Sequence, residues 1–154
     1  MNLNNDAAAE LTGLEQLEAL LRAGIQPPIA ITLGFSLVEI RHGFAVFEGQ
    51  PSSSVYNPLG GVHGGYAAAL LDSACGCAVH SRLDATQSYT TLEVKVAYHR
   101  GMTQASGTVR AEGTVMSLGR RVGFAQARLV DGGGQLCASA TSTLLIFDRR
   151  LTKP

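Results

Sequence analysis

Asp72 stands alone as a charged residue within a long apolar stretch. Between Glu48 and Arg82 there is no other Asp, Glu, Lys or Arg, and the residues around Asp72 are mostly Ala, Leu, Cys and Gly. Burying a carboxylate without partners is costly. Such a group is therefore either hydrogen-bonded at a structural contact or used in a reaction as a base or nucleophile, and for Asp72 taken alone both interpretations stay open.

A His-Gly-Gly triplet, His63–Gly65, opens the same stretch. If a helix begins there, its first backbone N–H groups have no partner within the helix and carry the positive end of the helix dipole. The two glycines leave room for an oxyanion or a polarised carbonyl to reach those N–H groups. The simpler alternative is a glycine-rich turn that His63 caps. Asn57 is a donor that could orient a substrate or a water, or only a turn residue before Pro58.

Distance decides whether Gly64 and Asp72 can act together. They are eight residues apart, which on a helix is about 12 Å along the axis. An attacking group must come within roughly 3–3.5 Å of a carbonyl carbon. If both residues act on one carbonyl, Asp72 must therefore come from a second copy of the chain, with two such helices antiparallel across a two-fold axis.

The elements that position these residues follow from the apolar patterns. The stretch 63–82 predicts a helix buried on most of its faces, because it is apolar almost all round. The leucines of 11–21 predict an N-terminal helix that ends near Gly24 and cannot continue through Pro27–Pro28. Strands are predicted at 33–40, 44–48, 91–99, 106–118, 120–130 and 135–147. In the third of these, Leu92, Val94, Val96 and Tyr98 alternate with Glu93, Lys95 and His99.

This order of elements predicts an α+β fold, in which a curved antiparallel sheet of about six strands wraps around one long central helix. We expect a single domain over 1–154, with a helix and lead-in at 1–28, the core at 29–148 and a polar tail at 149–154. One helix cannot cover the whole sheet, and an open sheet has two edges. The sequence therefore predicts a homodimer that continues the sheet edge to edge.

Composition narrows the class of protein. Of the 154 residues 45% are hydrophobic, and 12 basic residues balance 12 acidic ones, which excludes a disordered chain and a dedicated nucleic-acid binder. The cysteines, Cys75, Cys77 and Cys137, are odd in number and predict buried thiols in a reducing compartment. A polar N-terminus and the lack of a membrane-length apolar run predict a soluble cytoplasmic protein with no membrane partner. No metal-ligand spacing or nucleotide-binding loop occurs, so we expect neither a metal nor a cofactor.

Together, Asn57, the run Gly-Gly-Val-His-Gly-Gly at 60–65, and Asp72 in an Ala-rich helix resemble a known family. They are similar to the hotdog-fold acyl-CoA thioesterases of the phenylacetic-acid-degradation (PaaI) type and the 4-hydroxybenzoyl-CoA thioesterase group. The resemblance covers roughly 33–147, because the strand order agrees as well. It implies hydrolysis of an aryl or short- or medium-chain acyl-CoA to the free acid and CoA.

The resemblance also implies a role for each matching residue. The Gly64 N–H polarises the thioester carbonyl, and Asp72 of the neighbouring subunit acts as nucleophile or as general base for water, two roles that stay open. Asn57 helps to hold the attacking water or the carbonyl. His63 fixes the loop.

Further contacts follow from the same resemblance. A hydroxyl on the strand after the helix assists the carboxylate; Thr91 is favoured and Thr90 is the alternative. Beside Gly64, the substrate contacts expected near the helix start are Gly65 and Tyr66, with Leu33 or Phe35 in the acyl pocket. For binding the CoA phosphates, the Arg120–Arg121 pair is the first candidate and Arg100 is the second. The alternative is that these arginines are only solvated basic residues with no ligand.

Two other functions and one question of assembly remain open. A hydratase or dehydratase of the same fold could use His63 with Asp72, and a non-catalytic domain could bind acyl-CoA without turnover. We expect a homodimer with shared sites, assembled into a homotetramer as a dimer of dimers, although the sequence does not separate the tetramer from the simple dimer.

Overall fold

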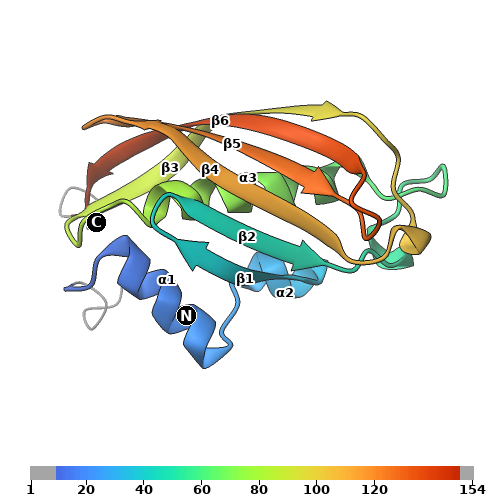
Figure 1. Cartoon of the computed structure of the whole chain (residues 1–154), viewed down its shortest axis with the longest axis horizontal. Coiled ribbons are helices and arrows are strands. Elements are labelled where there is room, and N and C mark those ends of the chain that lie inside the picture. The colour runs from blue at the N-terminus through green and yellow to red at the C-terminus, as the bar shows by residue number, and fades with distance from the viewer. Residues whose placement is uncertain (1–9, 150–154) are drawn as a thin grey trace.

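A seventeen-residue helix, α3 (Gly64–His80), runs through the middle of the molecule (Figure 1). The structure is a computed structural model and describes residues 10–149. Side chains on most faces of α3 are buried; Ala67, Leu70, Ala74 and Val79 have no exposed surface. The prediction of a buried helix over 63–82 is thus confirmed, since an apolar helix must be covered on most sides.

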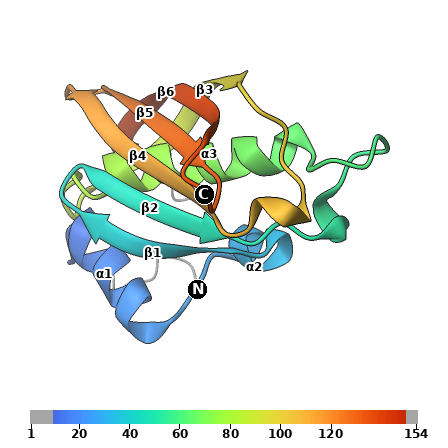
Figure 2. The same cartoon turned by 45° about the vertical axis from the view of Figure 1, so that its right-hand side comes forward.

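Six antiparallel strands form one sheet that curves over α3 (Figures 1 and 2). They are β1 (Phe35–Arg41), β2 (Phe44–Gly49), β3 (Gln87–Tyr98), β4 (Val109–Leu118), β5 (Val122–Val130) and β6 (Leu136–Asp148), and their order across the sheet is β1-β2-β4-β5-β6-β3. The expected α+β fold, about six strands around one central helix, is confirmed. β1 and β3 form the two edges.

Close contact between sheet and helix depends on small residues. A Cβ at Gly113 of β4 would overlap the backbone carbonyl of Ala74, so only glycine allows this strand to lie so near α3. A Cβ at Gly76 of α3 would lie 2.6 Å from the hydroxyl of Tyr89 on β3. These contacts fix the position of α3 relative to the strands on both sides.

The segment after the first helix departs from the sequence prediction. Residues Pro28–Leu33 form a short helix, α2, which was not predicted, and Gly34 ends it with a φ of 72°. Proline is well tolerated in the first turn of a helix, so Pro27–Pro28 ends one helix and begins another. Leu33 is consequently the last residue of α2, and the prediction that it begins the first strand is wrong.

The N-terminal helix forms as predicted. α1 spans Gly13–Ala23, with Thr12 and Glu15 in a reciprocal capping box and Gly24 in a left-handed conformation at the C-terminal end. Parts of the expected lead-in and tail, residues 1–9 and 150–154, lie outside the described residues. Within the described chain no helix is long and apolar enough to cross a membrane.

A buried polar cluster docks α1 against the end of α3. His80 Nε2 lies 3.1 Å from Gln16 Oε1 of α1, and Arg149 Nη2 donates to the same oxygen at 2.9 Å. Because an amide oxygen only accepts, His80 donates from Nε2, and its Nδ1 is buried without a hydrogen-bond partner among the described residues. Burial, together with the positive charge of Arg149, lowers the pKa of His80 to about 4.

Acidification is expected to destabilise the protein through His80. The pKa of this imidazole is lowered in the folded state from 6.5 to about 4. The contribution of neutral His80 to the free energy of unfolding is therefore fully present above pH 6.5. It is lost as the pH falls towards 4, and the free energy of unfolding drops by about 3 kcal/mol. Urea unfolding between pH 7 and pH 4 measures this loss, and His80→Gln, which does not titrate, should flatten the profile. Equal pH dependence in both proteins would refute the role of His80.

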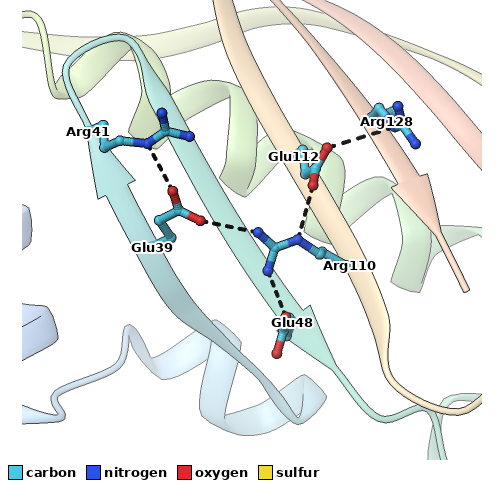
Figure 3. Close-up of polar contacts among 6 residues, drawn as sticks. All are labelled: Glu39, Arg41, Glu48, Arg110, Glu112 and Arg128. Carbon is cyan, nitrogen blue, oxygen red and sulfur yellow. Dashed lines mark hydrogen bonds and ion pairs between the residues drawn. The ribbon is translucent and has the colours of Figure 1, made fainter. Parts of the chain in front are cut away.

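Charged residues on the outer face of the sheet, the face turned away from α3, form an ion-pair network (Figure 3). Arg110 contacts Glu48 at 2.8 Å, Glu112 at 3.0 Å and Glu39 at 3.1 Å. The hydrogen bond to Glu112, with those to the other carboxylates, raises the pKa of Arg110. Arg110 is thus committed to three carboxylates of its own chain.

Candidate active site

The first turn of α3 presents backbone N–H groups at the positive end of the helix dipole. His63 precedes the helix and its Nδ1 accepts the N–H of Gly65 at 2.8 Å, while its carbonyl accepts the N–H of Tyr66 at 2.9 Å. No residue between 10 and 149 accepts the N–H of Gly64. His63 therefore caps the helix and takes up the N–H groups of Gly65 and Tyr66, whereas the Gly64 N–H, at the positive end of the helix dipole, is left for a ligand.

The loop before α3 is held by Asn57. Its Oδ1 accepts the N–H groups of Leu59 (2.9 Å) and Gly61 (3.3 Å), and its own N–H donates to the Gly61 carbonyl at 2.8 Å. The side-chain oxygen of Asn57 therefore has the structural role of a turn residue, which was one of the two alternatives. The side-chain amide nitrogen, in a half-buried position, is the part of Asn57 able to donate to a ligand.

Tyr98, at the end of β3, lies over Gly64. Its hydroxyl donates to the Gly64 carbonyl at 2.9 Å, and a Cβ on Gly64 would lie 3.0 Å from the ring and from the hydroxyl. Beside them is a cleft of about 350 Å³ whose lining includes Ala67, Arg100 and Met102. Gly64 is therefore part of the lining of this cleft.

Asp72 lies midway along α3, half-buried, and Thr91 of β3 reaches it. The Thr91 hydroxyl donates to Asp72 Oδ1 at 3.1 Å. Thr90, the alternative considered from the sequence, is exposed, and neighbouring residues of a strand point to opposite faces. The structure thus brings Thr91, rather than Thr90, to the carboxylate.

Three groups that lie close enough to Asp72 to feel its charge are Cys75, Cys77 and Tyr89. Burial, with a smaller effect from the charge of Asp72, raises the pKa of the Cys75 and Cys77 thiols to about 12. Burial likewise raises the pKa of the Tyr89 hydroxyl. These two thiols and the phenol therefore stay protonated at neutral pH.

Gly64 and Asp72 lie on one unbroken helix. Eight residues of helical rise separate them by about 12 Å, so within one chain they form two separate groups. The first is the Gly64 N–H with its cleft, and the second is the Asp72–Thr91 pair. Among residues 10–149, no group of three His, Cys, Asp or Glu side chains is placed to hold a metal ion.

The remaining sequence candidates lie elsewhere. Tyr66 is buried in the core with its ring 6.4 Å from that of Phe35, and its hydroxyl has no hydrogen-bond partner in the described chain. Arg120 and Arg121 are exposed and border a cleft of about 320 Å³ with Gln87 and Asp148. This cleft lies at the far end of α3 from Gly64, beside the start of β3.

Comparison with known proteins identifies the family of the chain. A family model described as the thioesterase superfamily matches residues 59–138, more than half of the chain. The chain belongs to the thioesterase superfamily. The matched residues include α3 and β3, and with them Gly64, Asp72 and Thr91. The protein is accordingly a thioester hydrolase with the hotdog fold.

Individual superfamily members show the same likeness. The chain is 24% identical over 119 residues to a 1,4-dihydroxy-2-naphthoyl-CoA hydrolase from Listeria monocytogenes, covering 77% of this chain and 95% of that protein. A thioesterase from Haemophilus influenzae superposes with a TM-score of 0.76 at 21% identity, covering 88% of this chain and 90% of the other. A variant of the phenylacetic acid degradation protein PaaI from Thermus thermophilus superposes with a TM-score of 0.70 at 28% identity. The superposition covers 77% of this chain and 98% of the other.

The sequence analysis did not identify Tyr98, which lies beside Gly64 and lines the same cleft. The alternation placed Leu92, Val94, Val96 and Tyr98 on one face. Val96 packs against the core and Tyr98 contacts Gly64, but the bulge between Thr91 and Glu93 breaks the pattern at Leu92. The alternation gave no sign that the end of β3 lies above the first turn of α3. Only the antiparallel packing of strand and helix shows that Tyr98 and Gly64 meet.

Proposed function

We propose that this protein hydrolyses acyl-CoA thioesters at sites shared by two subunits. The observation that carries the proposal is the pair of half-sites on one helix, a free Gly64 N–H and an Asp72 carboxylate about 12 Å away. Two α3 helices antiparallel across a two-fold axis bring each half-site to its counterpart. A second copy therefore completes the site without any change in the chain.

The proposed chemistry follows from the two half-sites. The Gly64 N–H accepts the charge that develops on the carbonyl oxygen. Asp72 of the partner subunit either removes a proton from the attacking water or attacks the carbonyl carbon itself to form an anhydride that water then cleaves. In both routes the C–S bond breaks and CoA leaves as a thiol. Asn57 and Thr91 orient the water and the carboxylate.

The substrate class rests on the relatives and on the clefts. The names of two relatives point to aromatic acids, a naphthoyl-CoA and phenylacetic acid. We propose an aryl or short- to medium-chain acyl group, with Tyr66 and Phe35 beneath the acyl pocket. The exposed cations Arg100, Arg120 and Arg121 suit the phosphates of CoA. We further propose that such dimers associate in pairs.

Thiol release from phenylacetyl-, benzoyl- and medium-chain acyl-CoAs tests this function. We expect turnover of at least one of them; no release from any member of the panel would contradict the proposal. The hydratase alternative is tested with an enoyl-CoA through loss of its conjugated absorbance. The capping bond of His63 to Gly65 gives His63 a structural role at the start of α3, which is the supporting role that the hydrolase proposal assigns to it.

Thr91→Val should lower kcat about tenfold, since it removes one hydrogen bond to a charged group while keeping the size of the side chain. Thr90→Val is the matched control on the neighbouring exposed position and should leave kcat unchanged. Steady-state thiol release with both variants makes the comparison. Equal rates in the two variants would show that the Thr91 hydroxyl does not assist Asp72.

A further inference from the structure

α1 makes polar contacts that its apolar packing does not require. Leu17 and Leu20 bury the apolar side of the helix against the core, with 3% and 7% of their surface exposed. Gln16, on the same helix, is only 2% exposed although its side chain is polar. Burying an amide costs free energy unless its nitrogen and oxygen find partners. The partners of Gln16 therefore show what this buried amide holds together.

The side chain of Gln16 connects three segments of the chain. Its amide nitrogen donates to the Leu11 carbonyl, before α1, at 2.7 Å. Its oxygen lies 3.1 Å from His80 Nε2 at the end of α3 and accepts from Arg149 Nη2, after β6, at 2.9 Å. The start of α1, the end of α3 and the end of β6 consequently meet at one amide, at the end of the molecule where β3 begins (Figure 1).

Arg149 extends this contact to the start of β3. Its Nε donates to the Gln87 carbonyl at 2.9 Å, and its backbone N–H donates to the Thr86 carbonyl at 2.8 Å. A guanidinium group is planar and its donors have a fixed geometry, so it holds the Gln16 oxygen and the Gln87 carbonyl at a set spacing. The position of α1 is thereby tied to the position of residues 86–87.

A second contact ties α1 to the same segment. The Gly13 N–H donates to the carbonyl of Leu83, a buried residue, at 3.0 Å. A Cβ on Gly13 would overlap the His80 carbonyl, so only glycine lets α1 lie this close to the end of α3. The segment 83–87, which leads from α3 into β3, is thus held by α1 at both of its ends.

Residues 86–87 belong to the lining of the cleft of about 320 Å³ that also contains Arg120, Arg121 and Asp148. Within residues 10–149 neither exposed guanidinium has an ion pair with a carboxylate. Two cations therefore face one carboxylate, that of Asp148, and the cleft suits a phosphate group. That this phosphate is part of CoA rests on the proposed function.

We propose that α1 is a positioning element of this cleft. Through Gln16 and Arg149 it holds the wall at Gln87, and so sets how tightly the phosphate end of an acyl-CoA binds. A wall that is fixed before the ligand arrives spares the complex the cost of ordering it. The wall carries none of the groups assigned to cleavage of the thioester. Loosening it should therefore weaken binding of the CoA part and leave the chemical step unchanged.

Gln16→Met tests the proposal, because it keeps the length of the side chain and removes the acceptor of Arg149. We expect KM for acyl-CoA to rise about tenfold, the equivalent of one hydrogen bond to a charged group, with kcat unchanged. KM for the same acyl group on N-acetylcysteamine, a thiol without phosphates, should not change. Gln16→Glu keeps an acceptor for Arg149 and should restore the wild-type KM.

Gln26→Met is the matched control. The Gln26 side-chain oxygen accepts the Leu37 N–H at 2.9 Å, so this glutamine ties the segment after α1 to β1 and not to the cleft. Both KM values should stay at those of the wild type. A variant that is merely less stable would lose activity on both thioesters alike. An unchanged KM for acyl-CoA in Gln16→Met, or an equal rise for both thioesters, would overturn the proposal.

Binding of free CoA, measured by isothermal titration calorimetry, separates this proposal from the proposed function. The dissociation constant should be about tenfold higher for Gln16→Met than for the wild type. Gly13→Ala, which displaces α1 while Gln16 stays intact, should weaken binding as well. A wild type that releases no thiol but shows these differences would refute the hydrolase and leave the role of α1 standing. Equal CoA binding by Gln16→Met and the wild type, or no binding by either, would overturn the role of α1.

Discussion

Asp72→Ala should lower kcat for acyl-CoA hydrolysis by about 10³-fold, within the range lost with a general base or nucleophile. In the described part of α3 the carboxylate has neutral neighbours, and the Cys75 and Cys77 thiols are held protonated by pKa values of about 12. No adjacent group can take over its role at neutral pH. Single-turnover and steady-state thiol release measure the effect.

Asp72→Asn separates chemistry from structure. The amide keeps the size of the side chain and an oxygen for the Thr91 hydroxyl, but it can neither accept a proton nor form an anhydride. It should be as inactive as Asp72→Ala and should unfold at the wild-type temperature. An asparagine variant with wild-type kcat would mean that Asp72 serves only as a structural hydrogen-bond acceptor.

Gly64→Pro should lower kcat/KM by about 10²–10³-fold, the loss typical of removing one oxyanion donor. Proline lacks an N–H, and the first position of a helix is where it is best tolerated. His63, with φ −64° and ψ 136°, already has the extended conformation required before proline. The substitution thus removes the donor while leaving α3 able to form.

Gly64→Ala is the matched control, because it adds a Cβ and keeps the N–H. Gly64 does not have a positive φ, so alanine meets no backbone penalty, but its Cβ would lie 3.0 Å from Tyr98. We expect alanine to cost less than proline, the difference measuring the N–H. Equal losses in the two variants would assign the whole effect to crowding against Tyr98.

Much of the fold was predictable because its signals are local. The apolar stretch around Asp72 indicated a buried helix, and alternation with short turns indicated the strands. α2 was missed because Pro27–Pro28 was interpreted only as a stop, although proline also begins helices. Leu33 was misplaced for the same reason.

The site was predictable in its residues but only partly in its geometry. A regular alternation through β3 would turn Thr91 away from α3, together with Glu93. The bulge at Leu92 shifts the alternation and lets Thr91 and Tyr98 both face the helix. A bulge depends on pairing with β6, which is distant in sequence, so no local pattern in 91–99 reveals it.

Complementation between inactive variants tests the shared active site most directly. Asp72→Ala and Gly64→Pro are produced together, so that their subunits pair at random. If each site takes Gly64 from one subunit and Asp72 from the other, every heterodimer contains one intact site, and the mixture should recover about a quarter of the wild-type activity. A mixture as inactive as its two parents would show that both residues act within one chain, and would contradict the account.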